Sequence, residues 1–103
     1  MLTLRQFYLI KLIEECQEVS QRAAKSMQFG ANETQKEQDK TNATRLRDEV
    51  EDLLGVIALV ENNTDDLPEV PISEHISRVV KKTEKIMKYL KYSQELGMVE
   101  NHD

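Results

Sequence analysis

The sequence predicts an all-α fold, and two observations carry this prediction. Of the 103 residues, 39% are hydrophobic, 32% are charged and only 5% are aromatic, so the β-branched and aromatic clusters that mark strands are scarce. Apolar residues instead recur every three or four positions over three long segments, which is the spacing of one face of a helix. We therefore expect one domain over residues 1–103, built as an antiparallel helical bundle.

The first helix is expected over residues 4–27, with Gly30 as its C-terminal cap. Lys25 falls in its last turn, where a cation complements the helix dipole. Cys16 lies in the middle of the apolar stripe and is predicted to be a core residue. The stripe consists of Tyr8, Leu9, Leu12, Ile13, Cys16, Val19, Ala23 and Met27.

The second helix is expected after a polar loop, residues 31–40, that lacks periodicity. Thr41 or Asn42 can cap this helix, because their side chains accept hydrogen bonds from the first backbone N–H groups. Its apolar stripe consists of Leu46, Val50, Leu53, Leu54, Ile57 and Val60. Pro68 and Pro71 then rule out continuation of the helix.

The third helix is expected to start at a cap provided by Ser73 and to end near Gly97. Its apolar stripe consists of Ile76, Val79, Val80, Thr83, Met87 and Leu90. The polar side carries a run of cations: Arg78, Lys81, Lys82, Lys85 and Lys88. Such a run is usually a solvated face, and contact with a phosphate is the functional alternative.

Length and charge limit the class of protein. The formal net charge of −5 would repel a nucleic-acid backbone, so no nucleic-acid partner is expected. No apolar stretch is long enough to span a membrane, and the N-terminus lacks the apolar region of a secretion signal, so we expect a cytoplasmic protein. The single cysteine excludes an intramolecular disulfide. A chain this short buries a modest core, which favours completion of the bundle by oligomerisation.

Two pairs of acids at i, i+3 spacing point to a binding site. With successive residues turned by about 100°, Glu15 and Glu18 lie on one flank of the first stripe. Glu49 and Asp52 lie on one flank of the second stripe in the same way. One acid of each pair, Glu15 or Glu49, intrudes on the apolar stripe. Packing of the two stripes would therefore bring four carboxylates together.

A group of four carboxylates has to be neutralised. At about 6 Å separation and an effective dielectric constant of about 20, each pair of carboxylates repels by roughly 3 kcal/mol. The group therefore takes up protons or holds cations. All-oxygen ligands select Mg²⁺ or Mn²⁺ over Zn²⁺. A di-iron site is excluded, because it requires Glu-x-x-His and neither His75 nor His102 follows a glutamate by three residues. A solvated acidic face is the alternative.

The acids also match a known family motif. The segments EECQE (Glu14–Glu18) and EVED (Glu49–Asp52) resemble the EExxE…ExxD signature of the MazG-like all-α nucleoside triphosphate pyrophosphohydrolases. This superfamily includes dimeric dUTPases and phosphoribosyl-ATP pyrophosphohydrolases. The helices around the acids are similar as well, and the resemblance covers residues 9–60, a little over half of the chain.

The resemblance implies Mg²⁺-dependent hydrolysis of an NTP or dNTP to the monophosphate and pyrophosphate by a homodimer or homotetramer. By the same resemblance, the metal ligands are Glu15, Glu18, Glu49 and Asp52, and Glu14 orients or deprotonates the attacking water. Metal ions would neutralise charge on the phosphoryl group and lower the pKa of that water.

A triphosphate substrate needs cationic partners as well as metal. Lys25, on the flank of Glu18, and Lys81 and Lys85 of the third helix are candidates for phosphate binding. Asn42 is a candidate donor to a base or sugar. The structural alternatives are a dipole-complementing residue for Lys25, an N-cap for Asn42 and a solvated face for the lysines.

Two other functions stay open. One is a non-catalytic helical interaction protein with the same fold, which predicts exposed acids and tolerance of Glu49→Ala. The other is a phosphoribosyl-ATP pyrophosphohydrolase, which differs in its substrate. The intrusion of Glu49 on an apolar stripe argues against the first, since an unneutralised buried carboxylate costs several kcal/mol.

Overall fold

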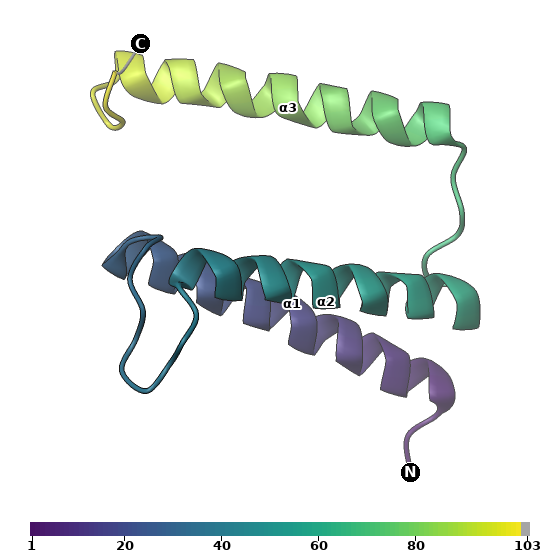
Figure 1. The fold of residues 1–103 in the computed structure, drawn as a ribbon. Helices are drawn as coiled ribbons and strands as arrows, with labels where there is room; N and C mark the ends of the chain where they lie inside the picture. Colours follow the sequence, from purple (N-terminus) through teal and green to yellow (C-terminus); the bar gives the residue numbers. More distant parts are fainter. Residues whose placement is uncertain (102–103) are drawn as a thin grey trace. The chain divides into compact units, whose positions relative to one another are not determined.

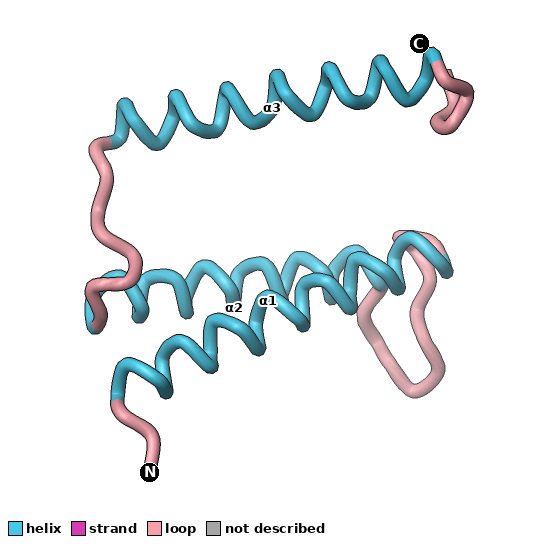
Figure 2. Tube along the Cα trace, turned by 180° about the vertical axis from the view of Figure 1, so that it is seen from behind, coloured by secondary structure: helices cyan, strands magenta, loops and turns pink. Residues whose placement is uncertain are grey.

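The computed structural model describes residues 1–101. It contains three helices, α1 (Leu4–Phe29), α2 (Asn42–Asn63) and α3 (Ile72–Glu95) (Figure 1). Over the described residues there is no strand (Figure 2). An isolated bridge joins Thr34 to Thr41. The predicted all-α class is confirmed. His102 lies outside the described residues.

The chain divides into two compact units, Met1–Pro68 with α1 and α2, and Glu69–Asp103 with α3. None of the described helices combines the length and the apolar character that crossing a membrane requires.

Local capping defines both ends of α1. The hydroxyl of Thr3 accepts a hydrogen bond from the Gln6 backbone N–H at 3.0 Å, and the Gln6 side chain accepts one from the Thr3 N–H at 2.9 Å, which is a capping box. Gly30 ends the helix at φ 97°, a region that favours glycine. The helix continues to Phe29, so Lys25 lies before the last turn, and its predicted role opposite the helix dipole is wrong. Its ammonium instead lies 5.6 Å from the centre of the Phe29 ring.

Thr41 is the N-cap of α2, and Asn42 ties the preceding loop to the helix. The Thr41 hydroxyl accepts a hydrogen bond from the Thr44 N–H at 3.2 Å. Asn42 is 1% exposed, and its amide donates to the Gly30 carbonyl at 2.9 Å and to the Glu33 carboxylate at 3.4 Å. The loop between the two helices is therefore anchored at the end of α1 and at the start of α2.

α3 begins one residue before Ser73, so the predicted Ser73 cap is wrong. Pro71 occupies the N-cap position with φ −56° and ψ 146°, and no side chain caps the helix. Gly97, with φ 74°, ends the helix region as predicted. Its N–H donates to the Gln94 carbonyl at 3.0 Å, and the Met98 N–H donates to the Ser93 carbonyl at 2.9 Å, which is the Schellman motif.

α1 and α2 pack side by side as an antiparallel pair (Figure 1, Figure 2). Each helix has one row of buried or half-buried side chains, and successive members of the row are alternately four and three residues apart. On α1 the row is Tyr8, Leu12, Glu15, Val19, Arg22 and Ser26, and on α2 it is Asn42, Leu46, Glu49, Leu53, Val56 and Val60. We call these two rows the seam. Its centre is polar, because it contains two carboxylates and a guanidinium.

The seam covers only one flank of the predicted α1 stripe. Its row passes through Leu12 and Val19, and Cys16 lies on the other flank. Cys16 is exposed, and its prediction as a core residue is wrong. Ile13 on the same flank is 57% exposed. Among the described residues, Val60 is the only fully buried hydrophobic side chain.

α3 separates apolar from basic residues. One row, again spaced by four and three residues, consists of Ile72, Ile76, Val79, Thr83, Ile86 and Leu90. Ile76 in this row is 55% exposed. A helix with such a face gains most of its stability from packing against another surface.

Candidate metal-binding site

The acidic group lies at the polar centre of the seam. Glu15 on α1 and Glu49 on α2 are half-buried, and Asp52, one turn after Glu49, is exposed. One carboxylate oxygen of each of these three residues lies within 4.8 Å of the others. The structure thus brings together one acid from α1 and two from α2 that the helical spacing had placed on facing flanks.

The charges around Glu49 show that Glu18 belongs to the same environment. Burial raises the pKa of the Glu49 carboxyl above its ordinary value. The negative charges of Glu18, Asp52 and Glu15 raise this pKa further, and that of Glu18 has the largest effect of the three. The positive charge of Arg22 lowers it. Three carboxylates therefore act on Glu49, and Glu18 is one of them although it is outside the group of three oxygens.

A buried oxygen of Glu15 has no partner. The Oε2 atom is excluded from solvent and accepts no hydrogen bond in the structure. Buried polar atoms are rarely left unpaired, because the lost hydration is not replaced. A bound cation would supply the missing interaction, and carboxylate oxygens from Glu15, Glu49 and Asp52 suit Mg²⁺ or Mn²⁺. The residues present therefore fit a hard divalent ion.

Glu14 does not lie with the other acids. Its carboxylate pairs with the Lys11 ammonium at 3.1 Å on the exposed side of α1. Its neighbour Glu15 points into the seam, since successive helical residues are turned by about 100°. The structure does not bring the Glu14 side chain into the group of three acids.

The predicted substrate contacts in the first unit are engaged in other interactions. The Lys25 ammonium lies over the Phe29 ring. The Asn42 amide nitrogen donates to the loop, whereas its Oδ1 atom is buried without a partner. Neither side chain is brought to the three acids in this structure.

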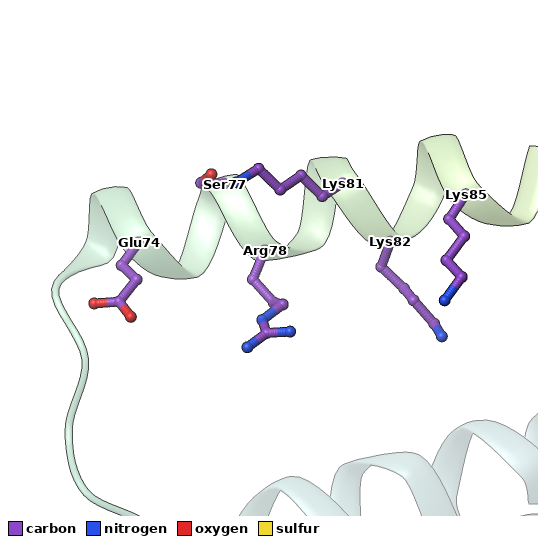
Figure 3. Close-up of a pocket in the computed structure, with 6 residues that line it drawn as sticks. All are labelled: Glu74, Ser77, Arg78, Lys81, Lys82 and Lys85. Atoms are coloured by element: carbon purple, nitrogen blue, oxygen red, sulfur yellow. The ribbon is translucent and has the colours of Figure 1, made fainter.

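The predicted contacts of α3 lie on its basic side. Lys81 and Lys85 line an open surface hollow, together with Glu74, Ser77, Arg78 and Lys82. Figure 3 shows Arg78, Lys82 and Lys85 projecting from one side of the helix, while Lys81 lies along it toward Ser77. These cations form a surface of the second unit.

Sequence reasoning missed Arg22. It follows Glu18 by four residues and Glu15 by seven, so all three share one face of α1. This spacing was the available signal, but an acid followed by a cation four residues later is typical of an exposed ion pair. Arg22 is instead half-buried in the seam, and its Nη1 atom is excluded from solvent without a hydrogen-bond partner.

Comparisons of the chain with protein-family models, with curated proteins and with solved structures find no match. No family is assigned by these comparisons. The acids of the seam and the cation beside them are the features on which a function rests.

Proposed function

We propose that the chain is a Mg²⁺-dependent nucleoside triphosphate pyrophosphohydrolase of the MazG-like type. The reaction uses water to cleave the anhydride between the first and second phosphates of an NTP or dNTP, which gives the monophosphate and pyrophosphate. The observation that carries the proposal is the convergence of Glu15, Glu49 and Asp52, with oxygens within 4.8 Å. Acids at the centre of a helix pair weaken its packing, and ligand binding gives a reason for them to be there.

Each acid of the site has a role in the proposed reaction. Glu15, Glu49 and Asp52 would hold the metal, and Glu18 adds negative charge beside Glu49. When bound, Mg²⁺ neutralises phosphate charge and makes a bound water more acidic. The raised pKa of Glu49 means that its negative charge is disfavoured at this place, and a bound cation would offset this. Packing of α1 against α2 places Glu15 and Glu49 on two neighbouring helices, so one ion would be held from both sides.

Pyrophosphate release tests this function. Ribo- and deoxynucleoside triphosphates and phosphoribosyl-ATP are each incubated with the full chain, with and without Mg²⁺. The expected result is metal-dependent release that Glu49→Gln abolishes. Glu51→Gln is the matched control, because Glu51 lies on the exposed side of α2 and pairs with Arg47 at 3.4 Å. Absence of release from every substrate contradicts the proposal.

We also propose that the helices form a bundle that a second copy of the chain completes, as a homodimer or a larger homotetramer. The support is the small core, in which Val60 alone of the described hydrophobic residues is fully buried. An open apolar groove on α1, lined by Leu12, Ile13, Cys16, Gln17 and Ser20, is left uncovered. Sedimentation equilibrium should give a mass of at least twice 12.0 kDa, and a monomer at all concentrations would contradict this assembly.

A non-catalytic helical interaction protein is the competing function, and the exposed apolar row of α3 favours it. This reading predicts that Glu49→Ala leaves partner binding unchanged and that Mg²⁺ does not alter stability. The pyrophosphohydrolase predicts the opposite result for Mg²⁺. Thermal melting of the wild-type chain in the presence and absence of Mg²⁺ distinguishes the two.

A further inference from the structure

Arg22 is a cation that the fold holds beside the acidic group without pairing it. It lies in the seam on the same face of α1 as Glu15 and Glu18. Among the described residues it takes part in none of the ion pairs. Its Nη1 atom is buried and donates no hydrogen bond. A guanidinium has five N–H donors in a planar fork, and those on the buried Nη1 atom have no acceptor in the structure.

The positive charge of Arg22 nevertheless acts on Glu49. It lowers the pKa of Glu49, against the effects of burial and of three neighbouring carboxylates. Arg22 is therefore close enough to act on Glu49, but it is not neutralised by a direct ion pair. A site with free carboxylate oxygens and a free guanidinium donor is complementary to a ligand that brings both a divalent cation and an anion.

We infer that Arg22 binds a phosphate group of the substrate, whose other phosphate oxygens contact the divalent ion held by Glu15, Glu49 and Asp52. This inference rests on the proposed function. Phosphate oxygens accept parallel hydrogen bonds from a guanidinium and also bind Mg²⁺. Lys25, the predicted phosphate contact on the same helix, is less suited, because its ammonium already lies against the Phe29 ring.

Titration calorimetry on the full chain tests the role of Arg22, with Mg²⁺ alone and inorganic triphosphate in the presence of Mg²⁺ as the two probes. The variants are Arg22→Ala and Arg22→Lys. Arg47→Ala is the matched control, since Arg47 is an exposed arginine on α2 that pairs with Glu51. Circular dichroism checks that each variant is folded. If Arg22→Ala does not fold, Arg22→Lys carries the test, because it keeps the charge and removes the fork.

We expect Arg22→Ala to weaken triphosphate binding by about 10- to 100-fold, with a smaller loss in Arg22→Lys and none in Arg47→Ala. Binding of Mg²⁺ alone should be unchanged or tighter, because a positive charge beside the site has been removed. Triphosphate affinity equal to that of the wild type in both Arg22 variants would overturn the inference and leave the proposed function standing. An equal loss of Mg²⁺ binding would show that Arg22 only supports the fold. A wild-type chain that binds neither probe would overturn the proposed function and the inference with it.

Discussion

Glu15 of α1 and Glu49 of α2 place carboxylate oxygens within 4.8 Å of each other across the seam. Both residues occupy positions that hydrophobic side chains fill in an ordinary helix pair. Their mutual repulsion is a property of the folded state, because the two helices are apart in the unfolded chain. Stability should therefore depend on whatever neutralises them.

Glu49→Gln should stabilise the chain at pH 7 without Mg²⁺ by about 1 kcal/mol, a common size for a single-site effect. The pKa of Glu49 is raised in the folded state, so the folded chain binds a proton more readily than the unfolded chain. Stability of the wild type should thus rise as the pH falls through the folded pKa of Glu49. Thermal melting across pH measures both effects. Glu51→Gln, on the exposed side, should change neither, and a variant less stable than wild type would contradict the prediction.

Mg²⁺ should raise the melting temperature of the wild-type chain. An ion that binds only the folded state at 100 times its dissociation constant adds about 2.7 kcal/mol. Glu15→Gln should remove most of this gain, because it takes away a ligand whose Oε2 atom is buried and unpaired. Glu14→Gln is the control, since Glu14 pairs with Lys11 away from the group. If Mg²⁺ raises the melting temperatures of Glu15→Gln and Glu14→Gln equally, the ion does not bind at Glu15.

Asn42→Ala should lower the free energy of unfolding by about 1–3 kcal/mol. The substitution leaves the Gly30 carbonyl without its donor at the end of α1. Denaturant unfolding measures the loss, and Asn62→Ala on the exposed side of α2 should have little effect. If both variants unfold alike, the loop anchor contributes nothing to stability.

Asp66→Asn should destabilise the chain at low salt. Asp66 accepts two hydrogen bonds from the Arg5 guanidinium, both at 2.8 Å, which join the start of α1 to the segment after α2. This pairing lowers the pKa of Asp66, so its contribution is present above the unfolded pKa and is lost as the pH falls through the folded pKa. Salt at about 1 M should also remove it. Melting of Asp66→Asn and of its neighbour control Asp65→Asn checks the effect, and a loss that persists in salt and acid has another cause.

Several helix ends could be predicted from the sequence, although the predicted Ser73 cap was wrong because α3 begins at Ile72 with Pro71 as its N-cap. Thr41, Gly30 and Gly97 mark helix ends because capping depends on a few neighbouring residues. The flank of the α1 stripe that faces α2 could not be predicted, since periodicity identifies an apolar stripe but not the direction of its partner. Cys16 was misplaced for this reason.

The same distinction applies to the site. Helical spacing pointed Glu15 and Glu49 toward the neighbouring helix, because their angle relative to the stripe is set by the chain itself. Arg22 was missed because its role depends on the acids of α2, which approach it only in the folded pair. Whether a charged side chain becomes an exposed ion pair or a buried donor is decided by tertiary packing.

The polar centre of the seam also bears on how this chain can evolve. Substituting leucine at Glu15 and Glu49 would convert the seam into a continuous hydrophobic contact, and such exchanges of buried charge for apolar groups often stabilise proteins. Random mutagenesis selected for heat resistance alone should therefore recover hydrophobic residues at these two positions. If the site has the proposed activity, selection for that activity would remove the same variants, so stability and activity would impose opposite demands on Glu15 and Glu49.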